Sequence, residues 1–184
     1  EFEDQLAGLK NLAAMSLEEK KVAGAIIIYR KLIKIDGNNS VEYLLNIASC
    51  YESQPDWEKA IACYREIIEI DKDNSVKYLL TIAGCYKTQS EWEKAIACYR
   101  EIIEIDGDNS GEYLWSIAGC YETQSEWKKA IACYRQIDRF PANYFAMANC
   151  HRKIQEHREA ITLYTQIKVC LLYTSDAADD TLWG

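Results

Sequence analysis

Cysteine and histidine are the residue types in this chain best suited to metal binding, disulfide formation or nucleophilic catalysis. The 184 residues contain eight cysteines and two histidines. Seven cysteines recur in register, with Cys50, Cys85, Cys120 and Cys150 in one series and Cys63, Cys98 and Cys133 in the other. Cysteine readily fills buried positions. The regular spacing therefore favours a packing role and reduced thiols over a disulfide framework.

A catalytic or metal site would need further polar groups beside these residues. His151 and His157 stand where earlier copies of the same pattern have tyrosine and tryptophan, so both are expected to fill packing positions. Cys150 and His151 are adjacent, which places them on different sides of a helix. The chain has no glycine-rich phosphate loop and no CxxC or HxxxH spacing. We therefore expect no enzyme activity, no metal and no cofactor.

The spacing of the cysteines follows from an internal repeat. The segment WEKAIACYREIIEID occupies residues 57–71 and again 92–106, and a diverged copy, WKKAIACYRQI, occupies 127–137. A fixed period of 35 residues indicates an array of one structural unit rather than a single globular core. Such an array buries its apolar residues between neighbouring units.

Each repeat predicts two amphipathic helices joined by a turn. Within residues 41–75, Leu44, Ile47 and Tyr51 are spaced as on one face of a helix. After a turn, a second apolar face runs through residues 57–70 with the same helical period. The structural unit is therefore a helical hairpin.

Local signals predict where these helices begin and end. Asp56 is expected to cap the helix that follows it, and residues 16–19 and 90–93 have the Ser-x-x-Glu pattern of a capping box. Gly37 and Gly107 follow the last apolar residue of a second helix, where a left-handed glycine is common. The pairs Asn39–Ser40, Asn74–Ser75 and Asn109–Ser110 are expected to cap the next first helix.

The repeat resembles the tetratricopeptide repeat family. The matching residues in one copy are Leu79, Ile82, Ala83 and Tyr86 in the first helix and Ala95, Tyr99 and Ile102 in the second. The resemblance implies an all-α fold, a right-handed α-solenoid of helix-turn-helix repeats. It covers residues 1–168 as an array of about five units, at 6–40, 41–75, 76–110, 111–140 and 141–168, the fourth of which is shortened.

The two ends of the chain carry separate expectations. Residues 169–184 do not continue the repeat, and residues 170–180 resemble an in-frame translation of a transposase-based sequencing adapter. We therefore expect this tail to be an artefact and assign it no function. The chain begins with Glu1 rather than methionine, so the N-terminus is expected to be incomplete.

The family resemblance implies a protein-protein interaction scaffold that holds a peptide or helix of a partner in a concave groove lined by the first helices. The candidate partner-binding residues are Leu45, Asn46, Ser49, Leu80, Thr81, Gly84, Trp115, Ser116, Gly119, Phe145 and Asn149. Trp115 is the first choice, because aromatic anchors often dominate binding energy. A purely structural alternative is that these side chains pack against neighbouring first helices.

Charge and hydropathy narrow the classes of partner. The net charge of −8 argues against nucleic acid, because binding phosphates requires clustered lysine and arginine. The chain lacks the run of about 20 apolar residues that a membrane helix needs, and reduced cysteines favour the cytoplasm. Two alternatives stay open, which are an RNA-binding repeat protein of the pentatricopeptide type and a scaffold arm of a larger enzyme or transport assembly.

Overall fold

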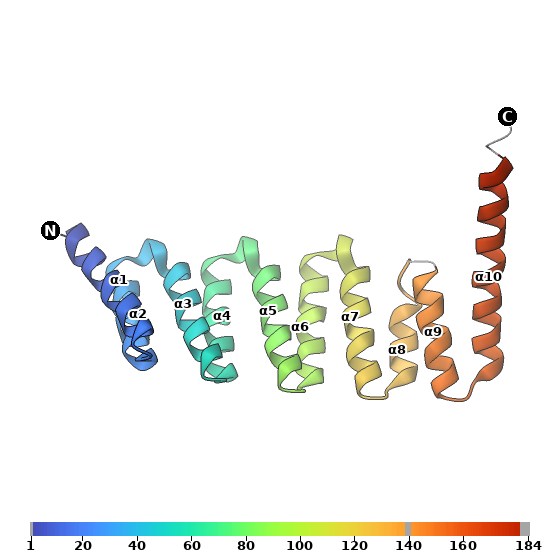
Figure 1. The fold of residues 1–184 in the computed structure, drawn as a ribbon, viewed down its shortest axis with the longest axis horizontal. Coiled ribbons are helices and arrows are strands. Elements are labelled where there is room, and N and C mark those ends of the chain that lie inside the picture. The colour runs from blue at the N-terminus through green and yellow to red at the C-terminus, as the bar shows by residue number, and fades with distance from the viewer. Residues whose placement is uncertain (1, 139–140, 181–184) are drawn as a thin grey trace. The chain divides into compact units, whose positions relative to one another are not determined.

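Helices are the only regular elements in the described part of the chain. The computed structural model describes the backbone of residues 2–138 and 141–180, and the side chains of residues 3–138 and 141–170. Within these ranges it has ten α-helices and three short 3-10 helices (Figure 1). The chain divides into two compact units, Glu1–Ser90 and Glu91–Gly184. The prediction of an all-α fold is confirmed.

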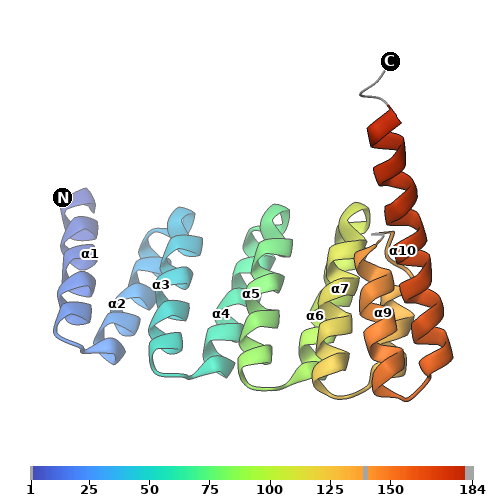
Figure 2. The same cartoon turned by 45° about the vertical axis from the view of Figure 1, so that its right-hand side comes forward.

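The first unit contains five α-helices that pack in chain order. They are α1 Phe2–Glu18, α2 Val22–Ile35, α3 Ser40–Ser53, α4 Trp57–Ile70 and α5 Ser75–Thr88. Helices α1 and α2 form one hairpin and α3 and α4 form another, while α2 also packs on α3 and α4 on α5. The 3-10 helices η1 Gly37–Asn39 and η2 Lys72–Asn74 join α2 to α3 and α4 to α5 (Figure 2).

The second unit also contains five α-helices. They are α6 Trp92–Ile105, α7 Ser110–Thr123, α8 Trp127–Tyr134, α9 Ala142–Lys153 and α10 His157–Asp180, with the 3-10 helix η3 Gly107–Asn109 between α6 and α7. Helix α8 has 8 residues where α6 has 14, as the shortened fourth repeat leads one to expect. Helix α10 has 24 residues and extends beyond α9 (Figure 1). The sequence predicts a separate tail at residues 169–184, but in the structure α10 continues without a break through this segment as far as Asp180.

Buried alanines recur at equivalent positions along the helices of successive repeats. Those at 4% exposure or less include Ala25, Ala48, Ala60, Ala83, Ala95, Ala118, Ala130, Ala148 and Ala160. The apolar faces of the second helices also bury isoleucine completely, at Ile67 and Ile102. Ile70 is 53% exposed and lies outside this face. The apolar face of α4 therefore ends before the last turn of the helix.

Of the caps predicted for the second helices, the aspartate is correct and the two serines are wrong. Asp56 caps α4, because its Oδ1 accepts a hydrogen bond from the backbone N–H of Lys59 at 3.4 Å. Ser16 instead lies in the last turn of α1, where its Oγ donates to the carbonyl of Leu12. Ser90 lies in the turn before α6 with φ of 60°. The N-cap residues of α2 and α6 are Lys21 and Glu91 instead, and neither makes a side-chain capping hydrogen bond.

The expected left-handed glycines are a further correction. No glycine in the described part of the chain has a positive φ, and Gly37 and Gly107 begin η1 and η3 instead. The preceding aspartates close the second helices, since the N–H of Asp36 donates to Leu32 O and that of Asp106 to Ile102 O, both at 2.8 Å. With these carbonyls satisfied, the chain enters the next helix through a 3-10 turn and needs no left-handed residue.

A repeated polar contact fixes the link between one hairpin and the next. Asn39 Nδ2 and Tyr43 OH donate to Asp36 Oδ2 at 2.8 and 2.7 Å. The same three residue types meet at Asp71, Asn74 and Tyr78 and at Asp106, Asn109 and Tyr113. The asparagine side chains therefore bond back to aspartate and do not cap the following helices, which corrects the prediction.

Replacing Tyr43 by phenylalanine is expected to raise the pKa of Asp36 toward its ordinary value. The hydrogen bond from Tyr43 is the main cause of the lowered pKa of this carboxyl, followed by the bond from Asn39. A lowered folded-state pKa means that the contact stabilises the fold above the unfolded-state pKa, and that this contribution is lost as the pH falls through the folded-state value. NMR titration of the carboxyl carbons measures the change.

Tyr51→Phe is the control for this titration. Tyr51 lies on the same helix as Tyr43, and no hydrogen bond joins it to Asp36 in the described structure. An unchanged Asp36 titration in Tyr43→Phe would contradict the assignment.

Candidate functional site

The six candidate partner-binding residues of the first unit lie on α3 and α5. Leu45, Asn46 and Thr81 are half-buried, whereas Ser49, Leu80 and Gly84 are exposed. Two of the polar side chains bond within their own helices, because Asn46 Nδ2 donates to Glu42 O and Thr81 Oγ1 donates to Lys77 O. Leu80 is the large apolar side chain most open to solvent in this group, at 40% exposure.

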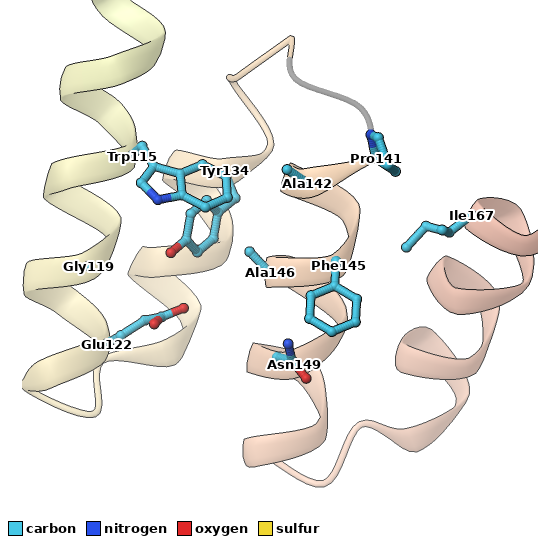
Figure 3. Close-up of a pocket in the computed structure, with 10 residues that line it drawn as sticks. All are labelled: Trp115, Gly119, Glu122, Tyr134, Pro141, Ala142, Phe145, Ala146, Asn149 and Ile167. Carbon is cyan, nitrogen blue, oxygen red and sulfur yellow. The ribbon is translucent and has the colours of Figure 1, made fainter. Parts of the chain in front are cut away.

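The candidates of the second unit lie on α7 and α9, and four of them line one groove. These four are Trp115, Gly119, Phe145 and Asn149, and the groove has a volume of about 670 Å³ (Figure 3). Its other lining residues are Glu122, Tyr134, Pro141, Ala142, Ala146 and Ile167. Ser116 is not among them, and its Oγ donates to the carbonyl of Glu112. The structure thus brings together α7, α8, α9 and α10 around one apolar concavity.

Two aromatic pairs shape the groove. The rings of Trp115 and Tyr134 meet edge to face, with centroids 4.8 Å apart and an interplanar angle of 65°. Phe145 makes a similar contact with Tyr164 at 5.8 Å and 67°. Phe145 stays 56% exposed, whereas Trp115 is half-buried. No side chain fills the space beside Gly119, where a Cβ would meet nothing within 4 Å. The groove is therefore open between its aromatic walls.

Asn149 contributes a polar group to the groove. Its Oδ1 accepts a hydrogen bond from Tyr164 OH at 2.8 Å, which fixes the orientation of the amide. Among the described residues, no partner is found for its Nδ2, and Figure 3 shows Asn149 beside Phe145 and Ala146 on α9. An amide held in this way can donate a hydrogen bond to a ligand carbonyl.

The carboxylate of Glu122 lines the groove but already accepts a hydrogen bond from a neighbouring side chain. Its Oε1 accepts a contact from Cys150 Sγ at 3.1 Å. Burial, and then the carboxylate, raise the pKa of the Cys150 thiol to about 12. Burial also raises the pKa of Tyr134, with Glu122 as the next cause. In the first unit, Glu52 similarly accepts from Tyr64 OH at 3.0 Å and from Cys85 Sγ at 3.8 Å. These thiols therefore stay protonated and serve packing.

Sequence reasoning missed Tyr134 and Ile167 as groove residues. Tyr134 occupies the same repeat position as Tyr64 and Tyr99, which are buried. Tyr134 is buried as well, at 3% exposure, and its contact with the groove depends on the shortened α8 and on the position of α9. Repeat position alone gives no signal for either residue, because both depend on where the last helices lie.

The described side chains form no cluster that could bind a metal ion. No group of three or more histidine, cysteine, aspartate or glutamate residues is placed to hold a metal ion in the part of the chain that was searched. His151 Nδ1 lies 2.6 Å from Glu156 Oε2, and Cys150 contacts Glu122 instead of its neighbour His151. None of the helices in the described ranges combines the length and hydropathy of a membrane span.

One protein family matches part of the sequence. Its description is Anaphase-promoting complex, cyclosome, subunit 3, and the match covers residues 18–102. Among curated proteins, none matches at a significant level.

Solved structures with the same fold include several tetratricopeptide-repeat proteins. MamA protein has a TM-score of 0.56 at 20% identity, covering 88% of this chain and 89% of that chain. A tetratricopeptide repeat protein from Parabacteroides merdae has a TM-score of 0.58 at 13% identity, covering 91% and 67%. The nearly identical TPR-like repeats of a Podosopora anserina protein, assigned as a kinesin light chain, give 0.53 at 13% identity, covering 92% and 96%. At these identities, the likeness shows the fold alone.

Proposed function

We propose that this chain, a tetratricopeptide-repeat protein, is an interaction scaffold that holds a peptide segment of a partner protein in the groove of its second unit. Repeat proteins of this fold generally mediate protein-protein interaction. The observation that carries the proposal is the open apolar groove between Trp115 and Phe145. Peptide binding in this groove is the function that the geometry supports best.

The chemistry of the groove fits a peptide with a large apolar side chain. Phe145 is 56% exposed on α9 and Ile167 reaches from α10 toward it (Figure 3). Removing such exposed apolar surface from water is the main driving force in peptide recognition. Asn149 Nδ2 is placed to bond a main-chain carbonyl of the same peptide, which would fix its register.

The test is a selection of peptides followed by direct affinity measurement. A display library of random 12-residue peptides is panned on the folded wild-type chain, and enriched peptides are measured by fluorescence anisotropy. Trp115→Ala and Phe145→Ala are each expected to weaken binding about 30-fold, because a hot-spot aromatic contributes about 2 kcal/mol or more. Phe145 matters as a second variant because its exposure makes its removal tolerable for folding.

Ile161→Ala is the matched control. Ile161 is 64% exposed on α10 and does not line the groove, so its loss is expected to leave affinity unchanged. Circular dichroism checks that every variant is folded. The proposal fails if no peptide is enriched, or if the enriched peptides bind both aromatic variants as tightly as the wild type.

A further inference from the structure

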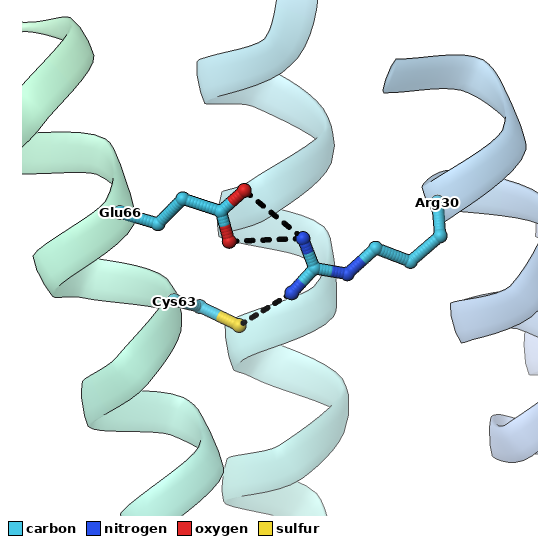
Figure 4. Close-up of polar contacts among 3 residues, drawn as sticks. All are labelled: Arg30, Cys63 and Glu66. Carbon is cyan, nitrogen blue, oxygen red and sulfur yellow. Dashed lines mark hydrogen bonds and ion pairs between the residues drawn. The ribbon is translucent and has the colours of Figure 1, made fainter. Parts of the chain in front are cut away.

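A contact between exposed side chains in the first unit shows how the second helices of two successive repeats are joined. Arg30 extends from α2 to α4, where its Nη1 donates to both carboxylate oxygens of Glu66 at 3.1 and 2.9 Å. Its Nη2 lies 4.0 Å from Cys63 Sγ, as Figure 4 shows. Arginine and carboxylate form strong charge-assisted hydrogen bonds of this kind. In this pair, the second helix of one repeat supplies the arginine, and the second helix of the next repeat supplies the glutamate.

The same helix positions recur in the second unit. Arg30 is the ninth residue of α2 and Arg100 is the ninth residue of α6. Arg135 stands at the equivalent repeat position, but it follows the last residue of α8 as its C-cap. Arg100 Nη2 donates to Tyr121 OH at 3.0 Å, and its charge lowers the pKa of Cys133 against the larger effect of burial. The arginine of one repeat therefore reaches toward the next repeat in this unit as well.

In the last hairpin, the residues that could accept a hydrogen bond from the arginine are different. Counting from the first residue of α10, Leu163 stands where α4 has Cys63, and Gln166 stands where it has Glu66. His151 replaces the tyrosine that accepts from Arg100, and its Nδ1 is already 2.6 Å from Glu156. Within the described side chains, Arg135 thus has no carboxylate in the place where Arg30 has Glu66.

A pocket lies at this position in the second unit. It has a volume of about 430 Å³, and its lining includes Arg135, Arg158, His151, Gln166, Leu163 and Met147. In the described residues, neither Arg135 nor Arg158 has an ion pair. Glu159 is the acidic residue of the lining, and it too has no ion pair with either arginine in these residues. The lining thus holds two guanidinium groups and one carboxylate, in a chain of net charge −8.

We propose that this pocket binds an oxyanion carried by a partner peptide, beside an apolar residue of the same peptide. The guanidinium groups of Arg135 and Arg158 present planar donors that match a carboxylate or phosphoryl group. Leu163 and Met147 offer apolar surface next to them. The bound oxyanion takes the place that the Glu66 carboxylate fills for Arg30.

The pocket is separate from the groove of the proposed function. The groove uses Ala142, Phe145 and Asn149 of α9, whereas the pocket uses Met147 and His151 from another side of the same helix. The inference therefore stands or falls independently of peptide binding at Trp115.

Three blocked pentapeptides test the inference. Each has a central residue flanked by leucines, and the central residue is glutamate, glutamine or phosphoserine. NMR titration follows the Nε–H signals of Arg135 and Arg158 in the full chain. The glutamate and phosphoserine peptides are expected to shift these signals and to bind at least about tenfold more tightly than the glutamine peptide. Tighter binding of phosphoserine assigns a phosphorylated partner, and equal binding or a glutamate preference assigns an acidic one.

Gln166→Glu is the decisive variant, because it supplies the missing carboxylate within the chain. It is expected to pair with Arg135 and to weaken binding of the glutamate peptide about tenfold or more. Arg135→Gln should have the same effect, whereas Arg152→Gln, an exposed arginine of α9 outside the pocket, should not. Equal binding of the glutamine peptide, or unchanged binding in folded Gln166→Glu, overturns the inference.

Discussion

Replacing Ile67 by alanine is expected to lower the free energy of unfolding by about 2–5 kcal/mol. Ile67 lies on α4 and its side chain is fully buried, at 0% exposure. Truncation removes apolar contacts and leaves a cavity that the surrounding helices fill only in part. Urea unfolding followed by circular dichroism measures the loss, and hydrogen exchange at α4 locates it.

Ile70→Ala provides the matched control, with the same chemistry in the same helix. Ile70 is three residues further on and 53% exposed, so its truncation is expected to change stability by less than about 0.5 kcal/mol. The contrast between the two variants isolates burial from helix propensity, since both replace isoleucine by alanine in α4. Equal losses in both variants would contradict the placement of the apolar face.

Thiol reactivity is expected to separate one cysteine from the other seven. Cys170 is exposed, whereas Cys50, Cys63, Cys85, Cys98, Cys120, Cys133 and Cys150 are buried. Burial raises the pKa of Cys150 to about 12 and that of Cys85 to about 11. With an ordinary pKa of 9.0, the thiolate fraction of Cys150 near pH 8 is about a thousandfold lower than that of an ordinary cysteine. Ellman's reagent should therefore detect one fast thiol per folded chain.

The Cys170→Ser variant and a pH series complete this test. The variant should lose the fast phase, while urea should release seven thiols in both proteins. A raised folded-state pKa means that protonated thiols support the fold below the unfolded-state value, and that this support is lost as the pH rises through the folded-state values near 11 and 12. Several fast thiols at neutral pH would show that the helices open readily.

The repeat in the sequence was sufficient to predict the hairpins and their core. Ala60 and Ala95, or Ile67 and Ile102, occupy equal positions 35 residues apart and are buried alike. This follows because identical side chains at a fixed period meet equivalent neighbours in a stacked array. The aspartate and tyrosine of the Asp36–Tyr43 contact also recur at this period, at Asp71 and Tyr78 and at Asp106 and Tyr113.

The helix ends were less predictable, for a local reason. Ser16 matches a capping box in sequence, yet its hydroxyl bonds to Leu12 inside α1. Gly107 suits a left-handed conformation, yet the backbone N–H of Asp106 already satisfies the end of α6. Sequence motifs give the bonds that a residue can make, whereas the path of the chain decides which of these bonds forms.

The sequence by itself determined the repeated helical hairpin, the buried alanines and isoleucines, and the acidic character of the chain. Only the tertiary structure decided which variable positions meet. Trp115 and Phe145 share a groove because the short α8 and the last hairpin place Tyr134 and Ile167 beside them. Arg135 lines a pocket together with Gln166 of α10. Gln166 occupies the helix position at which α4 has Glu66, the partner of Arg30. Contacts between residues far apart in the chain depend on packing, which a repeating pattern specifies only where the repeats remain alike.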